Sequence, residues 1–132
     1  MKKVPASHKD LLKDQTKAFA YLATTMKDGF PQVTPIWFNT EDDYIMINSA
    51  EGRVKDRNMR ARPLVALVIA DPNDPYRYLQ IQGRVIGYTP EGADEHIDAL
   101  SYKYTGNEKY QWRNDKDTRI KYTISIEKVD AH

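Results

Sequence analysis

Hydrophobic and polar residues alternate along much of the chain in short runs separated by tight turns, which predicts a mainly β protein. The segments predicted as strands are 18–26, 32–39, 44–48, 64–70, 76–88 and 119–129. Segment 18–26 is alanine-rich and also compatible with a helix, but the Asp28-Gly29 turn after it favours a hairpin strand. Segment 64–70 is apolar throughout, as expected for a buried strand.

Two residues interrupt these strand patterns. Pro35 lies inside 32–39 and has no backbone N–H to donate, so we expect this segment at a sheet edge, at a bulge, or where a ligand lies against the backbone. Gly83 breaks the alternation of 76–88 and predicts a bulge at which the strand bends.

Three helices are predicted between the strands. The segment Ser7-His-Lys-Asp10 fits a capping box and predicts a short helix over 7–15. A basic helix follows the third strand and is ended by Pro63. Thr89-Pro90 predicts the start of the third helix, whose apolar stripe should face the core and which Gly106 can close.

This order of elements predicts one domain over residues 1–132. Short strands joined by tight turns, with one helix inserted between strands and another before the last, indicate a small antiparallel barrel of six to seven strands plugged by helices. Closing the sheet removes exposed strand edges. A length of 132 residues suits a single core.

Composition excludes several other classes. Hydrophobic residues make up 40% and charged residues 30%, which is ordinary for a soluble globular domain. No apolar run could cross a bilayer and none at the N-terminus resembles a secretory signal, so we expect a cytoplasmic protein without membrane contact. There are no cysteines and the three histidines lie far apart in the sequence, so neither a thiolate nucleophile nor a metal site is expected.

Positive charge is concentrated in one segment. Residues 53–62 hold five basic side chains against one acid, a local net charge of +4 in a chain of net charge +1. A Ser-Ala-Glu-Gly loop opening such a helix offers backbone N–H groups, a positive dipole end and fixed cations, which together favour phosphate or another anion. The alternative is a solvated basic helix face. The near-neutral total charge argues against a nucleic-acid binder.

Three segments together resemble a known family. They are DGFPQVTPIWF (28–38), SAEGRVKDRNMRARPLVAL (49–67) and YLQIQGRV (78–85). In this order and spacing they are similar to the signatures of the split-barrel flavin-binding proteins related to pyridoxamine phosphate oxidase, in the branch that uses FMN or the deazaflavin coenzyme F-420. The resemblance extends over residues 18–129. It implies an FMN-binding type of split β-barrel that forms a homodimer, with two cofactor sites at the subunit interface.

The resemblance also implies which residues bind the cofactor. Around its phosphate it places Lys55, with Ser49, Arg53 and Arg57 nearby and Asn58 orienting the loop. Beneath the isoalloxazine ring it places Pro35, Ile36 and Trp37, and on an opposing strand Tyr78 and Gln80. The loop with Tyr110, Trp112 and Arg113 is expected to reach the partner's site. From the residues alone, a core position is the better expectation for an isolated strand tryptophan such as Trp37, and Gln80 could lie only on the solvent-exposed face of its strand.

The implied function is an oxidoreductase that exchanges hydride between bound coenzyme F-420, or FMN, and a small unsaturated organic substrate. Extra cations beyond Lys55 favour the longer anionic tail of F-420. No acid–base side chain is required, although Tyr78 is the best candidate for a proton donor. The chain lacks the terminal arginine-containing motif of true pyridoxamine phosphate oxidases, which argues against oxidation of vitamin B6. The alternatives are a non-catalytic FMN or F-420 carrier or sensor, and a heme-handling split barrel, for which no histidine is well placed.

Overall fold

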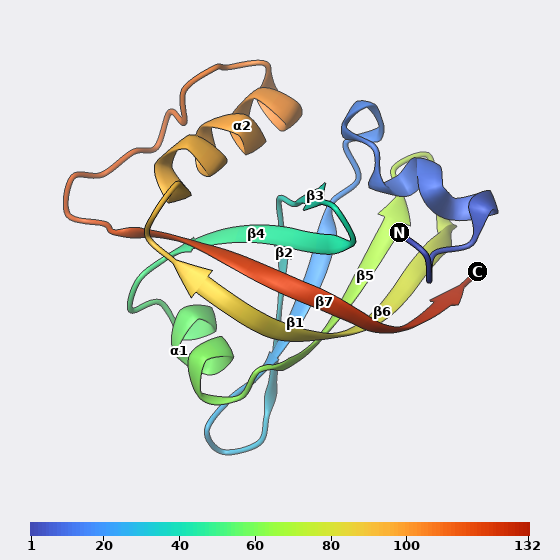
Figure 1. The fold of residues 1–132 in the computed structure, drawn as a ribbon, viewed down its shortest axis with the longest axis horizontal. Helices are drawn as coiled ribbons and strands as arrows, with labels where there is room; N and C mark the ends of the chain where they lie inside the picture. The colour runs from blue at the N-terminus through green and yellow to red at the C-terminus, as the bar shows by residue number, and fades with distance from the viewer.

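The computed structural model describes residues 1–132 and contains a seven-stranded antiparallel sheet rolled into a split barrel (Figure 1). The strands are β1 (Ala20–Thr25), β2 (Pro31–Ile36), β3 (Asn39–Glu41), β4 (Tyr44–Ala50), β5 (Leu64–Asp71), β6 (Asp74–Thr89) and β7 (Arg119–Ala131). Their order is β2-β1-β5-β6-β7-β4-β3, so β2 and β3 are the two edges. The predicted mainly β split barrel is confirmed, and the seventh strand is the short β3, which starts at the end of segment 32–39.

The helices are α1 (Val54–Ala61), α2 (Ala93–Thr105) and two short 3₁₀ helices, η1 (Ala6–Leu12) and η2 (Asp14–Thr16). Helix α1 lies between β4 and β5, and α2 lies before β7, in the predicted order (Figure 1). No helix is both long enough and apolar enough to span a bilayer.

Two predicted helix starts were wrong. The expected α-helix over 7–15 consists of the two 3₁₀ helices, because Lys13 between them is extended (φ −77°, ψ 145°). Ser7 does not cap it, since its Oγ lies 2.8 Å from His8 Nδ1. Helix α2 begins after Gly92, which has φ 73°, while Thr89 Oγ1 accepts a hydrogen bond from the Glu91 N–H in the preceding turn. The predicted closure at Gly106 is confirmed, with φ 82°.

The barrel interior is the hydrophobic core, formed by alternate residues of the strands. The prediction that segment 64–70 is buried throughout was wrong. In β5 the side chains of Val65, Leu67 and Ile69 are buried, whereas Leu64 is 56% exposed. The reason is that β5 belongs to a single curved layer, so only one of its faces meets the core.

The bulge predicted at Gly83 is confirmed. The β6–β7 register shifts between Gln82 and Gly83, where β7 supplies one extra residue. A Cβ atom at position 83 would lie 2.7 Å from Ile124 Cγ2 and 3.0 Å from the Ser125 carbonyl oxygen. Glycine is therefore required because the two strands approach too closely for a side chain.

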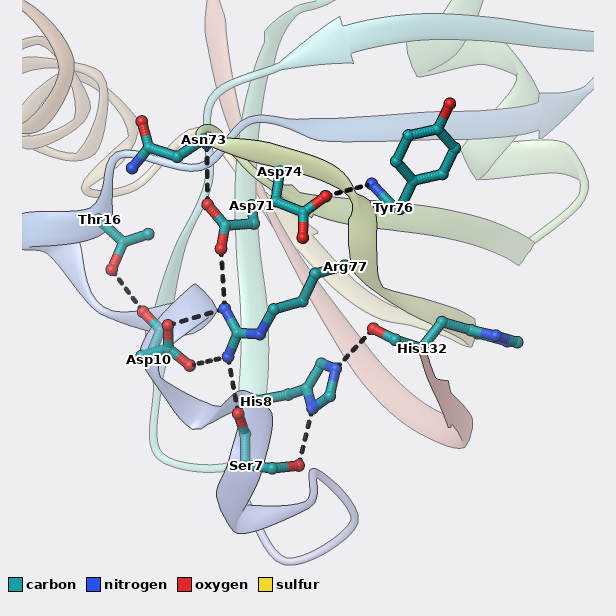
Figure 2. A network of polar contacts seen from close by, with 10 residues as sticks. All are labelled: Ser7, His8, Asp10, Thr16, Asp71, Asn73, Asp74, Tyr76, Arg77 and His132. Atoms are coloured by element: carbon teal, nitrogen blue, oxygen red, sulfur yellow. Dashed lines mark hydrogen bonds and ion pairs between the residues drawn. The ribbon is translucent and has the colours of Figure 1, made fainter.

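Both chain termini are tied to the β5–β6 hairpin, away from α1 and α2 (Figure 2). Arg77 donates to both carboxylate oxygens of Asp10, at 2.6 and 3.1 Å, to Asp71 at 3.0 Å and to the Ser7 carbonyl at 2.6 Å. His8 Nε2 lies 2.8 Å from the His132 carbonyl oxygen. This polar network stabilises the end of the barrel at the β5–β6 hairpin, and helices α1 and α2 take no part in it.

Candidate functional site

A pocket of about 260 Å³ lies where the sheet is split, between the end of β2, β4, β7 and α2. Its lining residues are Phe19, Pro35, Ile36, Trp37, Asn48, Ile97, Leu100, Tyr110, Trp112 and Arg119. The structure thus brings together three of the predicted site residues, Pro35, Ile36 and Trp37, in one cavity. It adds aromatic walls and two polar groups, Asn48 and Arg119.

Pro35 is tolerated here because β2 is an edge strand whose only neighbour is β1. The missing N–H therefore removes no bond to a second strand, and the other edge of β2 carries backbone groups without a sheet partner. Of the three alternatives expected for Pro35, the structure shows the edge position. An edge of this kind can offer main-chain hydrogen bonds to a ligand in the adjoining pocket.

Trp37 is half-buried and belongs to an aromatic wall of this pocket. Its ring stacks on Tyr104 at a centroid distance of 5.3 Å and meets the Tyr110 ring edge-on at 6.2 Å. Trp112 lies 6.5 Å away on the same side. Trp37 is absent from the buried core, so the alternative of a core tryptophan is wrong.

Helix α2 is fastened over the pocket by polar contacts to the chain around β2. The Tyr104 hydroxyl donates to the Ala18 carbonyl at 2.7 Å and lies 3.2 Å from the Phe38 N–H, which donates to it. The buried Lys103 ammonium donates to the Phe38 carbonyl at 2.6 Å, and burial lowers the pKa of Lys103. These contacts hold the aromatic wall against the end of β2.

The loop 107–117 folds back onto α2 of its own chain. The Tyr110 N–H donates to Asp98 Oδ1 at 2.8 Å, and Arg113 pairs with Asp98 at 2.6 Å and with Asp94 at 3.1 Å. The side chains of Tyr110 and Trp112 consequently line the pocket of their own protomer. The expectation that this loop also reaches the partner's site stays a prediction.

The start of α1 carries the cations of the site. Lys55 is half-buried and makes no hydrogen bond or ion pair with the protein. Burial lowers the pKa of the Lys55 ammonium, and the positive charges of Arg53 and Arg119 lower it further. Arg53 itself bonds only weakly to Asp117, at 3.4 Å. Of these three cations Arg119 lines the pocket, and its charge and that of Arg53 act on Lys55. Asp117 is the one acid bonded to any of them, so net positive charge remains, which favours binding of an anion.

Asn48 and Arg119 are the site residues that sequence reasoning missed. Arg119 Nε donates to Asn48 Oδ1 at 2.9 Å across the β4–β7 pair, and both side chains line the pocket. A polar Asn48 directly after the apolar run 45–47 was the one available signal. The nearness of Arg119 could not be seen, because β4 and β7 are far apart in the sequence and only their pairing joins these residues.

Ser49 and Asn58 lie apart from the pocket. Ser49 shares the inward face of β4 with Ile45 and Ile47, is 2% exposed, and its Oγ has no hydrogen-bond partner. Strand alternation turns Asn48 rather than Ser49 toward the pocket, so Ser49 does not line it, and its place beside the phosphate stays a prediction. Asn58 is buried and donates to Thr24 Oγ1 at 3.0 Å, so it anchors α1 to β1. This contact agrees with an orienting role for Asn58.

The remaining predicted residues lie elsewhere on the surface. Arg57 is exposed on α1. Pro35 pairs with Tyr21, Tyr21 with Val68, and Val68 with Gln80, which places Gln80 three strands away on the outer face of the sheet. Tyr78 stacks on His132 with ring centroids 4.8 Å apart. One protomer alone does not bring Tyr78 and Gln80 to the pocket, so their role stays a prediction.

The residues present fit a planar anionic cofactor. An aromatic pocket accepts a flat ring, the edge of β2 offers backbone groups for its polar rim, and the unpartnered Lys55 with its neighbouring arginines suits a phosphate. No group of three or more His, Cys, Asp or Glu side chains is arranged to hold a metal ion.

Comparison with known proteins agrees with this geometry. The profile of the family described as pyridoxamine 5'-phosphate oxidase matches residues 5–132. An F-420 reductase of known structure is 29% identical, with a TM-score of 0.85 over 96% of this chain and 98% of that chain. A conserved hypothetical protein of Mycobacterium tuberculosis (19% identity, TM-score 0.74, 97% and 84% covered) and HupZ of Group A Streptococcus (18%, 0.66, 97% and 93%) share the fold. The protein therefore belongs to the pyridoxamine 5'-phosphate oxidase family.

Proposed function

We propose that this protein is an oxidoreductase that binds coenzyme F-420 or FMN and serves hydride exchange with a small unsaturated organic substrate. The single observation that carries the proposal is the unpartnered Lys55 within electrostatic reach of Arg119, which lines an aromatic pocket at the edge of β2. The similarity to an F-420 reductase supports it. The number of cations near Lys55 favours F-420, whose anionic tail is longer.

The chain's own residues bind and orient, while the cofactor, when bound, supplies the hydride chemistry. Lys55 and Arg53 would hold the phosphate through charge-assisted hydrogen bonds, each worth roughly 1.5–3 kcal/mol. Pro35 and Ile36 would present the strand edge to the ring, and Trp37 would offer it a flat apolar surface. The aromatic wall would keep water from the reacting face.

We also propose that the protein works as a homodimer. The side chains of Tyr21, Val33 and Leu64 on adjacent strands are 43%, 62% and 56% exposed on the outer face of the sheet. Neighbouring apolar side chains of this kind are typical of an interface with another protein surface. Tyr78 and Gln80 are on the same sheet, so a second copy seated there could bring them to a pocket that they do not reach within one protomer.

The function is tested by titrating the protein separately with F-420 and with FMN and following cofactor fluorescence. We expect saturable binding of at least one, and a loss of affinity on the order of tenfold to a hundredfold in Lys55→Ala from removal of a charged hydrogen bond. Lys9→Ala, on the exposed side of η1, is the matched control and should bind as the wild type does. Absence of binding by both cofactors, or equal affinity in Lys55→Ala, would refute the assignment.

A second measurement distinguishes an enzyme from a non-catalytic cofactor carrier or sensor. The reduced holoprotein is mixed with a panel of small unsaturated acceptors, and reoxidation of the cofactor is followed by absorbance. An oxidoreductase should reoxidise with at least one acceptor faster than the free reduced cofactor does. Reoxidation no faster than that of the free cofactor across the panel would favour a carrier or sensor.

A further inference from the structure

We propose that Arg119 is an additional oxyanion-binding residue of this pocket and that Asn48, itself oriented by the buried His96, aims its guanidinium at the ligand. The inference rests on the proposed function, and it adds a residue that binds negative charge in that same site. The oxyanion could belong to the phosphate of the cofactor or to an acidic group on a second ligand, and the experiment below separates these sources.

A chain of hydrogen bonds links four elements behind Arg119. Asn39 in β3 contacts His96 in α2, His96 contacts Asn48 in β4, and Asn48 contacts Arg119 in β7, at 2.9, 3.1 and 2.9 Å. His96 is only 5% exposed. Each of these hydrogen bonds joins segments that are distant in the sequence, and the last residue of the series, Arg119, lines the pocket.

The donors and acceptors in this chain allow one arrangement. The Asn48 amide nitrogen donates to the Ala93 carbonyl at 2.9 Å, a group that can only accept. Asn48 Oδ1 must then face Arg119 Nε, which can only donate, and His96 Nδ1 must accept from the same amide nitrogen. The proton of His96 consequently lies on Nε2 and is donated to Asn39 Oδ1. A neutral histidine satisfies every contact, and burial lowers the pKa of His96 to about 4.

The outer end of the Arg119 guanidinium is left without a protein partner. Its Nε is occupied by Asn48, whereas Nη1 and Nη2 make no hydrogen bond or ion pair. The guanidinium carbon lies 5.4 Å from the centre of the Tyr110 ring, which limits its freedom on one side. Asp117, which attracts Arg119, is bonded to Arg53 instead.

Burial and a neighbouring positive charge act against the Arg119 cation. Burial lowers the pKa of Arg119 and the charge of Arg53 lowers it further, against opposing effects from Tyr110, Asp117 and Tyr122, and Arg119 in turn lowers the pKa of Lys55. Partial burial of a cation without an anionic partner costs free energy, and the cost is greater where two such cations, Arg119 and Lys55, repel each other. An oxyanion bound between Arg119 and Lys55 would compensate both, with the planar guanidinium offering two parallel N–H donors.

The experiment compares wild type, Arg119→Gln, Asn48→Ala and the remote control Lys9→Gln. Dissociation constants for FMN and for riboflavin, which lacks the phosphate, are measured by flavin fluorescence. Quenching by benzoate is measured on the FMN-loaded protein as a test of a second, acidic ligand. Stabilisation by inorganic pyrophosphate in a thermal melt supplies a readout that does not depend on any flavin.

We expect Arg119→Gln to weaken binding of the oxyanion at least tenfold, and Asn48→Ala to weaken it by a smaller factor because the guanidinium is present but no longer aimed. A fall in the FMN-to-riboflavin affinity ratio assigns the oxyanion to the cofactor, and a fall in benzoate affinity alone assigns it to a second ligand. A merely structural defect would weaken FMN and riboflavin equally and leave their ratio unchanged.

The inference would be overturned if Arg119→Gln left three quantities unchanged. They are the ratio of FMN affinity to riboflavin affinity, the affinity for benzoate, and the stabilisation by pyrophosphate. If wild type bound neither FMN nor F-420 but kept an Arg119-dependent response to pyrophosphate, the proposed function would fail and the oxyanion site would stand. The Lys9→Gln control excludes a general effect of removing one positive charge.

Discussion

The hydroxyl group of Tyr122 donates a hydrogen bond to Asp56, joining the buried centre of β7 to the helix that carries Lys55. Asp56 also accepts from the Gly52 N–H and from Arg60 Nε, each at 2.9 Å. Burial alone would raise the pKa of this carboxyl group, but the donors outweigh it and hold the pKa of Asp56 below its usual range. Asp56 therefore fixes the start of α1, so that Lys55, its neighbour in sequence, is held within electrostatic reach of Arg119 in the pocket.

Tyr122→Phe should destabilise the fold, because it leaves a buried carboxylate with one donor fewer. The expected loss in free energy of unfolding is about 1–3 kcal/mol, measured by urea denaturation at pH 7. The lowered pKa of Asp56 means that its contribution exists above the unfolded-state pKa and is lost as pH falls through the folded-state value. An unfolding free energy equal to that of the wild type at pH 7 would contradict this account.

The stability of the protein should also fall on mild acidification because of His96. Burial, with a smaller effect from the charge of Lys121, lowers its pKa from 6.5 to about 4, so below pH 6.5 the unfolded chain binds a proton that the folded chain does not. Stability should therefore decline as pH falls from 6.5 toward 4, by up to roughly 3 kcal/mol at the lower limit.

Urea titrations at pH 7 and pH 5 check the His96 prediction. The difference between the two unfolding free energies should be smaller in His96→Gln, which has no titrating group at this position. A difference equal to that of the wild type would show that the acid sensitivity arises from other groups.

Gly83→Ala should destabilise the barrel by about 1–3 kcal/mol, because the new methyl group has no room. It would meet Ile124 Cγ2 at 2.7 Å and a backbone oxygen of Ser125 at 3.0 Å, and the backbone cannot move without disturbing the β6–β7 pairing. Gly87→Ala, on the same strand with nothing within 4 Å of the added Cβ, is the matched control. Equal unfolding free energies for the two variants would refute the steric explanation.

Leu64→Glu should convert the proposed homodimer to a monomer, because a carboxylate would be buried without a partner in the interface. Molar mass is measured by light scattering after size exclusion, at several concentrations. Tyr102→Glu is the control, since Tyr102 is 62% exposed on α2 and lies outside the proposed interface. A wild type that is monomeric at every concentration, or a Leu64→Glu variant that remains dimeric, would exclude this interface.

Much of the fold followed from local patterns in the sequence. Three predictions were confirmed because each depends only on neighbouring residues. They are the alternating strands β6 and β7, the hairpin turn at Asp28-Gly29, and the bulge at Gly83. Pro35 limited its segment to three alternatives, of which the sheet edge is one, because a missing N–H is a local property with a direct consequence for pairing.

The tertiary structure alone decided which side chains meet. Residues 48 and 49 differ by one position, yet only the pairing of β4 with β7 shows that Asn48 faces Arg119 while Ser49 faces the core. The order of strands, and with it the joining of β2, β4, β7 and α2 around one pocket, depends on contacts between distant segments. The sequence by itself determined the strands, turns and basic helix because these depend on neighbouring residues, whereas the site was decided by long-range packing.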